Sequence, residues 1–355
     1  MEMMMSNEWD VEPTEDFEED VETKVYQITS YPADLTLKGY LDKVDADQIL
    51  VPDFQRKYVW DQKRASKLIE SFLLGLPVPG VFLYKIRSSN KLSIIDGQQR
   101  ILSSVRFFQN RFEEKIFRLS GVMPRWEGRT YDELDEPDRL LLNDTVLRAT
   151  IVQQLDPADD SSIYHIFERL NTGGMNLNPM EIRRSVYQGA FANLLEELNE
   201  NEHWRNIIAR PKIDKRLRDV ELVLRVLALQ TGWKVYEKPM KTFLNTFMAD
   251  INKKSEADLK QFLADVKIDF EWAVRIIDEQ LWEKPFHLRG PMNYAVLDSV
   301  FSVVANSNEE LEDFSSRFES LLSSPAYLSA TSVSTSDERV VKIRFEEAEK
   351  YLGGD

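Results

Sequence analysis

Hydrophobic residues follow two different spacings along the chain, and the change comes near residue 155. Before it, short apolar runs such as GVFLYKI and LSII are bounded by turn residues, which indicates strands, and a hairpin is expected where RSSNK separates these two. Beyond it, almost every segment repeats apolar residues at the helical period. The pattern predicts an α+β fold class, with an α+β domain over residues 23–155 and an all-α domain over residues 156–355.

Local signals predict the individual elements. Asp61 is an expected N-cap for the helix QKRASKLIESFLLG, which Gly75 closes, and another helix is expected from Gln98 to about Phe108. Further strands of the first domain are expected at VYQITSY, EKIFRL and TVLRATIVQQL, and further helices at DLTLKGYLDKVDADQ and YDELDEPDRLLLND. Helices of the second domain are expected at SSIYHIFERLN, NPMEIRRSVYQGAFANLLEELN, DVELVLRVLALQ, KTFLNTFMADI, EADLKQFLADVKIDFEWAVRIIDEQLW, NYAVLDSVFSVVA and LEDFSSRFESLLSS.

The composition is typical of a soluble protein of the cytoplasm. Of the 355 residues, 43% are hydrophobic, which is enough for packed cores. The absence of cysteine excludes disulfides, cysteine nucleophiles and cysteine-ligated zinc, and it suits a reducing compartment. No apolar run is long enough for a membrane helix, and the start MEMMMSNEWD lacks the basic and apolar regions of a signal peptide. We therefore expect a cytoplasmic protein with no membrane contact.

Much of the net charge of −16 lies at the N-terminus. Residues 1–22 contain ten of the 61 acidic residues and no basic residue, which leaves 51 acids against 45 bases in the remainder. A segment of this composition buries too little apolar surface to fold alone, so a disordered acidic tail is predicted over residues 1–22. The tail either keeps the protein soluble or covers a basic surface.

The stretch LSIIDGQQRI places polar residues where an expected strand meets an expected helix. The first N–H groups of a helix have no intrahelical partners and the helix dipole is positive there, so such an end binds phosphate. Gly97 allows the backbone to approach a ligand, and Arg100 has a planar fork suited to phosphate oxygens. Gln98 and Gln99 add neutral donors, and Asp96 is a candidate to hold Mg²⁺ or orient water. The alternative is a turn in which Asp96 caps the helix and the other side chains face solvent.

Two further motifs carry candidate binding residues. In PDFQRKYVW, Arg56 lies among three aromatic residues; the rings are expected in the core, whereas the guanidinium needs an anionic or carbonyl partner. In FERLNTGGMNLNPMEIRR, a helix ends near Asn171 and the pair Gly173 and Gly174 breaks it. This loop is either a corner between two helices or a lid that closes over a ligand through Asn171, Thr172 and the glycine amides.

Together, PDFQRxYVW, IIDGQQR and FxRLNTGGxxLxxxExRR, in this order, resemble the N-terminal domain of GmrS–GmrD-type restriction endonucleases. This bacterial family is also called the DGQQR family and is related to the ParB and sulfiredoxin fold. The resemblance extends to RDVELVLRVLALQ and covers most of residues 25–350. It implies a ParB-like core that binds a nucleoside triphosphate with Mg²⁺, and a role in defence against phage DNA.

The resemblance also implies roles for single residues. It assigns hydrolysis to the DGQQR side chains Asp96, Gln98, Gln99 and Arg100, with Asp96 as the candidate metal ligand. It assigns nucleotide binding to Arg56, Gly97, Arg100, Asn171, Thr172, Gly173 and Gly174. Glu181 and Arg184 match the family pattern as well, and they are expected to brace the loop before them.

The chain departs from complete family members in its histidines. The nuclease half of such enzymes uses an HNH-like metal site, which needs histidines close to acidic residues. Here the histidines are His165, His203 and His287, far apart in the sequence, and each is expected in an ordinary structural role. The chain therefore resembles a stand-alone sensor or nucleoside triphosphatase unit, and a separate nuclease or other defence protein is an expected partner.

A local basic segment is a candidate contact for DNA. Residues 205–218, RNIIARPKIDKRLR, hold six basic residues and one acid. Phosphate contact requires only such a local patch, whatever the overall charge. The alternative is an ordinary solvated face of the protein.

Three functions follow from the sequence. The first is a nucleoside triphosphate-binding and hydrolysing sensor of a phage-defence system. The second is a non-catalytic DNA-binding or adaptor module that uses the DGQQR turn structurally or on the phosphate backbone, and the third makes the ParB-like domain a nuclease. Release of inorganic phosphate and retention of duplex DNA distinguish them.

Overall fold

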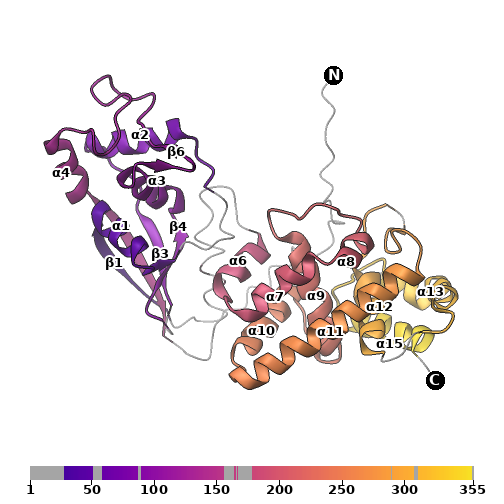
Figure 1. Cartoon of the computed structure of the whole chain (residues 1–355). Helices are drawn as coiled ribbons and strands as arrows, with labels where there is room; N and C mark the ends of the chain where they lie inside the picture. The colour runs from indigo at the N-terminus through magenta and orange to yellow at the C-terminus, as the bar shows by residue number, and fades with distance from the viewer. Residues whose placement is uncertain are drawn as a thin grey trace, which may run out of the picture. The chain divides into compact units, whose positions relative to one another are not determined.

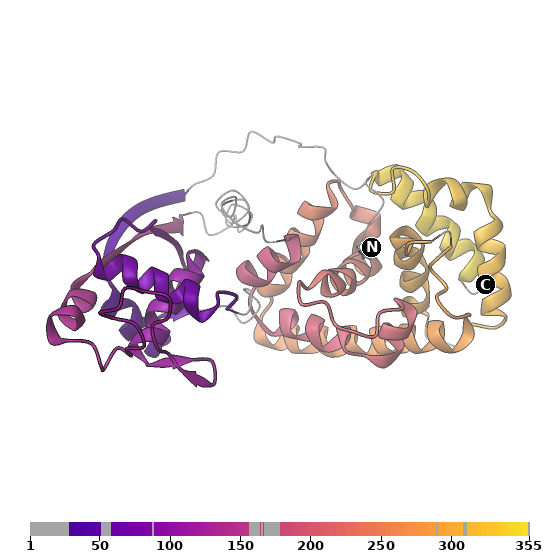
Figure 2. The ribbon, with the colours of Figure 1, turned by 90° about the horizontal axis from the view of Figure 1, so that it is seen from above.

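The computed structural model describes residues 28–50, 58–86, 89–155, 164, 166, 178–288, 290–307 and 311–353. These residues form two compact units, which divide between Val186 and Tyr187. Figure 1 and Figure 2 show a first unit with strands and helices and a second unit built of helices. The α+β class predicted from the hydrophobic pattern is confirmed. The acidic tail predicted over residues 1–22 lies outside the described residues.

A mixed sheet of five strands lies at the centre of the first unit, in the order β1-β7-β3-β4-β2. The strands are β1 (Ile28–Thr36), β2 (Ile49–Leu50), β3 (Val81–Lys85), β4 (Leu92–Asp96) and β7 (Val146–Gln154). Strand β7 pairs antiparallel with β1 and parallel with β3. The predicted hairpin is confirmed, since β3 and β4 pair antiparallel with Phe82 opposite Asp96. This pairing brings the end of β4 beside the start of β3.

Helices lie along one face of this sheet (Figure 1), and a smaller core lies on the other. One face carries α1 (Leu37–Asp45), α2 (Gln62–Leu73), α3 (Gln98–Phe108) and α4 (Glu136–Asp144). The other face packs against Ile182 of α6 (Pro179–Val186). Alternate strand residues serve the two cores: Val81 and Leu83 face the four helices, whereas Phe82 and Tyr84 belong to the other core. The sequence places a domain boundary at residue 155, whereas the compact units divide after α6.

Helix ends in the first unit follow the expected chemistry. The Asp61 side chain accepts a 2.7 Å hydrogen bond from the Arg64 N–H at the start of α2, which confirms the predicted N-cap. Gly75 follows the end of α2 with φ of 67°, a conformation that suits glycine. Helix α3 begins at Gln98 and ends at Phe108, as predicted.

Three predicted elements are shorter or different. Residues 34–36, expected as the start of a helix, extend β1, and α1 begins only at Leu37. Of EKIFRL, only β6 (Lys115–Ile116) is a strand, which pairs with β5 (Arg111–Phe112). Of YDELDEPDRLLLND, only α4 is an α-helix.

The second unit is helical, as expected. Its helices are α7 (Ala190–Asn199), α8 (Glu202–Ile207), α9 (Arg218–Gly232), α10 (Met240–Asn252), α11 (Glu256–Gln280), α12 (Tyr294–Asn306), α13 (Phe314–Ser323), α14 (Pro325–Ala330) and α15 (Glu338–Leu352), with a short 3₁₀ helix η2 (Trp233–Val235). Helices α9 and α12 are buried along most of their length. Between them the buried Asp298 carboxylate accepts hydrogen bonds from Arg225 Nε, at 3.1 and 2.9 Å, and lies 3.3 Å from Arg344 Nη2. No helix in the described part of the chain is long and apolar enough to cross a membrane.

Candidate functional site

The junction between β4 and α3 is formed by Gly97. Its φ is 94° and its ψ is 11°, in the left-handed region that glycine enters at little cost. A Cβ at this position would lie 2.3 Å from Val81 Cγ1 and 2.7 Å from Val81 Cβ. Glycine is therefore required here by the close approach of α3 to β3, independently of any ligand.

Asp96 and Arg100 face each other across the first turn of α3. Arg100 Nη2 donates to Asp96 Oδ2 at 2.7 Å and to the Gly80 carbonyl oxygen at 3.0 Å. The Asp96 side chain is 43% exposed and that of Arg100 is 19% exposed. The sequence pattern places the two charges one turn apart, and the antiparallel β3–β4 pairing adds Gly80. The carboxylate and the guanidinium thus neutralise each other, and the carboxylate remains accessible to solvent.

Gln99 joins the DGQQR motif to the end of the PDFQRKYVW motif. Its Oε1 accepts hydrogen bonds from the N–H groups of Val59 at 3.1 Å and Trp60 at 3.3 Å. One turn further along α3, Ser103 Oγ lies 2.8 Å from the Tyr58 hydroxyl. Burial raises the pKa of Tyr58, so its hydroxyl stays protonated at neutral pH. Two of the three sequence motifs are thus held together by side chains of one helix.

The structure describes only some of the remaining predicted site residues. Gln98 opens α3 and is partly exposed. Arg56 and the loop 171–174 lie outside the described residues, as does His165. The end of the third motif is described: Glu181 is buried, its Oε2 accepts from the Asn178 N–H at 2.7 Å, and its own N–H donates to Asn178 Oδ1 at 2.9 Å. This reciprocal capping fixes the start of α6.

The first turn of α3 differs from that of α2 in its cap. In helix α2 the Asp61 carboxylate accepts from the first-turn N–H of Arg64, whereas the N-cap of α3 is a glycine with no side chain. Helix N-termini favour oxyanions through their N–H groups and the positive end of the dipole. The carboxylate of Asp96 beside this end is suited to a divalent cation that also contacts the anion. Among the residues the structure describes, no three His, Cys, Asp or Glu side chains form a metal-binding group.

The basic segment 205–218 is only partly available for a ligand. Arg205 is buried: Nη1 pairs with Asp219 at 2.8 Å, and Nε and Nη2 donate to the carbonyl oxygens of Arg210 and Lys212, each at 2.6 Å. Arg218 Nε donates to Asp214 Oδ2 at 2.6 Å. Arg205 and Arg218 therefore hold the loop in shape. Its exposed basic side chains are Lys212, Lys215 and Arg216.

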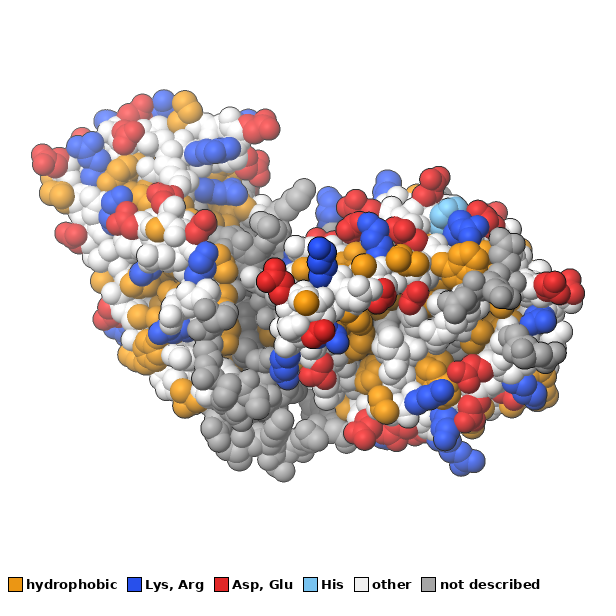
Figure 3. Space-filling model, turned by 60° about the horizontal axis from the view of Figure 1, so that its bottom comes forward, with side chains coloured by type: hydrophobic (Ala, Val, Ile, Leu, Met, Phe, Trp, Pro, Cys, Tyr) orange, Lys and Arg blue, Asp and Glu red, His pale blue; other side chains and the backbone are white. Residues whose placement is uncertain are grey.

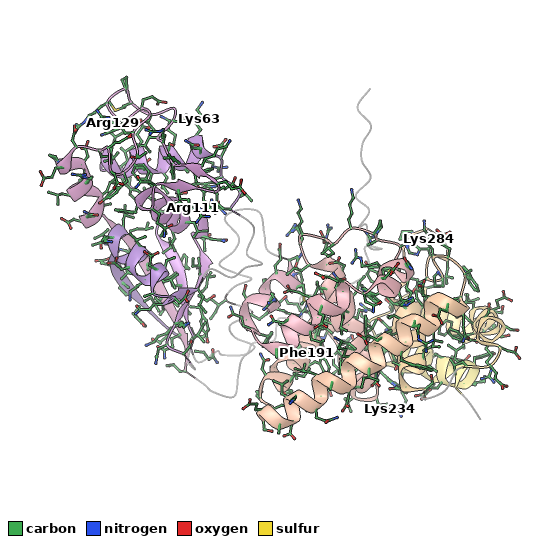
Figure 4. All side chains as sticks on the ribbon, in the orientation of Figure 1. Lys63, Arg111, Arg129, Phe191, Lys234 and Lys284 are labelled. Atoms are coloured by element: carbon green, nitrogen blue, oxygen red, sulfur yellow. The ribbon has the colours of Figure 1, made fainter. Side chains whose placement is uncertain are left out.

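A second loop adds positive charge to this region. Burial lowers the pKa of His287, and the charges of Lys284 and Arg210 lower it further. The His287 ring is thus close enough to Arg210 of the basic loop, and to Lys284, for their charges to act on it (Figure 4 labels Lys284). No sequence signal relates these two segments, because they are more than sixty residues apart. His203 is also placed: its Nδ1 lies 2.8 Å from Asp278 Oδ2.

Residues 37–188 match the family described as GmrSD restriction endonuclease, N-terminal domain. The match begins just after β1 and covers the other strands, the DGQQR turn and α6. This segment belongs to the GmrSD N-terminal domain family. Membership links the GmrSD N-terminal domain of this chain to restriction-type defence systems. No curated protein and no solved structure matches the chain at a significant level.

Proposed function

We propose that the chain is a nucleoside triphosphate-binding component of a restriction-type defence system and that the triphosphate binds at the N-terminus of α3. The observation that supports this most is the glycine N-cap of α3 between Asp96 and Arg100. A charged side chain on either side of an uncapped helix end provides for both a phosphate and its cation. The family description supports the defence role.

Arg100 carries the central step of binding in this proposal. In the structure its guanidinium is bonded to Asp96, so a phosphate group replaces the carboxylate as the acceptor when it binds. Mg²⁺ typically binds through one or two carboxylates plus substrate phosphate oxygens, and the exposed Asp96 fits that role. A bound Mg²⁺ supplies neutralisation of phosphate charge. Once released from Arg100, the Asp96 carboxylate would hold the Mg²⁺ or orient the water for hydrolysis.

The other candidate residues have supporting roles in the proposal. Gln98 contributes a neutral donor at the helix end, and Gln99 acts by holding the Val59–Trp60 backbone. Arg56 and the loop Asn171–Gly174 complete the nucleotide site. We also propose DNA as a partner, contacted through Lys212, Lys215 and Arg216 within the segment 205–218, and a separate nuclease as the effector.

The non-catalytic adaptor is the second candidate, and one set of observations favours it. Arg100, Gln99 and Gly97 each have a structural task, toward Gly80, the Val59–Trp60 backbone and Val81 respectively. In that case the DGQQR turn fastens α3 to the sheet and no nucleotide binds.

Titration calorimetry with Mg²⁺ and each common nucleoside triphosphate distinguishes the nucleotide-binding function from the adaptor function. Arg100→Ala is the test variant, and Arg118→Ala is a matched control. Arg118 Nη1 likewise donates to one carboxylate, Glu133, at 2.7 Å and to one backbone carbonyl, of Gly128, at 2.9 Å. Loss of a charge-assisted contact to phosphate costs about 1.5–3 kcal/mol. The proposal predicts weaker binding by about ten- to a hundredfold in Arg100→Ala and wild-type binding in Arg118→Ala.

Phosphate release by the same variants tests hydrolysis. Asp96→Ala is expected to reduce the rate more than the affinity if the carboxylate acts through Mg²⁺ or water. Wild-type protein that binds no triphosphate at millimolar concentration supports the adaptor instead.

A further inference from the structure

Two loops of the second unit, one between α8 and α9 and one between α11 and α12, form a basic surface. Its members are exposed or partly exposed basic side chains: Arg210, Lys212, Lys215, Arg216 and Lys284. Burial lowers the pKa of His287, and the charges of Lys284 and Arg210 lower it further, so both loops lie close to this ring. The basic surface therefore joins segments that are far apart in the sequence.

Nearby acids leave the basic surface largely unneutralised. Asp214 is the one acid in residues 205–218, and its Oδ2 accepts from Arg218 Nε at 2.6 Å. Glu283 is the one acid in residues 281–288. The three lysines of the basic surface make no ion pair with any residue that the structure describes. They are therefore available to an anionic partner.

The same loops also expose apolar side chains. Ile213, next to Lys212, is 50% exposed, and Trp282, two residues before Lys284, is 41% exposed. Interfaces between proteins typically combine an apolar centre with a charged and polar rim. Contacts to phosphate alone leave the apolar side chains in water. The combination fits a peptide that contains both acidic and apolar side chains.

The acidic tail, residues 1–22, has this composition. It contains ten acids and no base, and acids lie on either side of Trp9 in NEWD and of Phe17 in EDFEED. Figure 3 shows acidic and basic side chains mixed over the faces in view, without a broad acidic region. The faces seen there thus offer no comparable partner for the basic surface of a second copy.

The chain before Ile28 is long enough to reach the basic surface of the same molecule. Residues 1–27 span up to about 90 Å when extended. A unit of about 170 residues is roughly 40 Å across. A tethered partner has an effective concentration on the order of millimolar, so even weak pairs of exposed charges hold it in place for part of the time.

We propose that the acidic tail binds the basic surface of its own chain and shields it from other anions. The carboxylates pair with the three lysines and Arg216, and an aromatic ring of the tail covers Ile213. The contact lies within one chain and requires neither nucleotide nor DNA, so it goes beyond the proposed function and does not depend on it. A duplex that uses Lys212 and Lys215 has to displace the tail first.

The test is acetylation of lysines followed by mass spectrometry, on the full chain and on a chain that lacks residues 1–22. The rates at Lys212, Lys215 and Lys284 are compared at low salt. Lys234 is the internal control, because it is an exposed lysine of the same unit with its Nζ over the Trp233 ring, and it lies well away from Lys284 (Figure 4 labels both).

Removal of residues 1–22 is expected to speed acetylation of the three lysines by about two- to fivefold and to leave Lys234 unchanged. The difference should disappear at about 1 M salt, where charges are screened within about 3 Å. Equal rates in the two chains would overturn the proposal, as would an equal change at Lys234. Protection that increases with protein concentration would also overturn it, because the tail would then bind a second copy.

A full-length chain with a neutral tail keeps the test decisive if the shortened chain does not fold. Every Glu→Gln and Asp→Asn replacement in residues 1–22 removes the charge and keeps the length. Faster acetylation of the three lysines in this variant, with Lys234 unchanged, supports the contact. Wild-type rates at these lysines overturn it.

Discussion

Gly97→Ala tests why the DGQQR motif contains a glycine. The added methyl group would lie 2.3 Å from Val81 Cγ1, and the backbone would have to keep a φ of 94°. The left-handed conformation costs a non-glycine residue about 1–2 kcal/mol. Forcing a methyl group into packed surroundings costs about 1–3 kcal/mol more. We therefore expect Gly97→Ala to lower the free energy of unfolding by about 2–5 kcal/mol.

Gly75→Ala is the matched control for this substitution. Gly75 also has a positive φ, 67°, but nothing lies within 4 Å of its Cβ position. Its replacement therefore carries the backbone cost alone, about 1–2 kcal/mol. The difference between the two variants isolates the contact with Val81.

The assay is urea unfolding of the whole chain, combined with hydrogen exchange of peptides from β3 and α3 so that the first unit is followed separately. Val81→Ala in the Gly97→Ala background removes the Cγ1 atom and should recover part of the loss. A Gly97→Ala variant no less stable than Gly75→Ala would refute the packing argument, and the glycine would then need a ligand as its explanation.

Three further predictions concern the second unit. Asp298→Asn removes the buried carboxylate that Arg225 and Arg344 both contact, and we expect urea unfolding to show a loss of about 3–5 kcal/mol. Arg205→Ala removes the bonds that hold loop 209–217, so hydrogen exchange in this loop should accelerate and the salt dependence of duplex binding should flatten. Because the folded pKa of His287 lies below the ordinary value of 6.5, the unfolded chain takes up the proton first, and the free energy of unfolding should fall as the pH drops below 6.5. In unfolding measured at successive pH values, His287→Gln should remove this part of the pH dependence.

The sequence predicted elements whose signals are local. Asp61 caps α2 because a carboxylate before a helix accepts from its first-turn N–H groups, and Asp-Gly after an apolar run marked the β4–α3 junction. Residues 34–36 were predicted wrongly as helix. With a single apolar residue they carry no periodic signal of their own, and they form strand because they pair with residues 146–148 of β7, more than one hundred residues away.

The candidate site likewise depends on contacts between residues far apart in the sequence, which local patterns do not predict. Asp96, Gln99 and Arg100 lie together at the first turn of α3, as their spacing in the sequence predicts. Their hydrogen bonds to Gly80, Val59 and Trp60 depend on how β3 and α2 are placed, and no local pattern contains that information. In the basic segment, a count of charges could not show that Arg205 is buried and paired with Asp219.

The proposed function requires a nucleoside triphosphate to bind at the first turn of α3. Backbone amide NMR shifts of Gln98, Gln99 and Arg100 on addition of Mg²⁺ and triphosphate test it most directly, with the first-turn amides of α2 as an internal reference because Asp61 caps that helix. Binding there should cause large shifts in α3 that Arg100→Ala abolishes or weakens, and little change in α2. Unchanged α3 amides at millimolar triphosphate, or equal shifts in both helices, would contradict it.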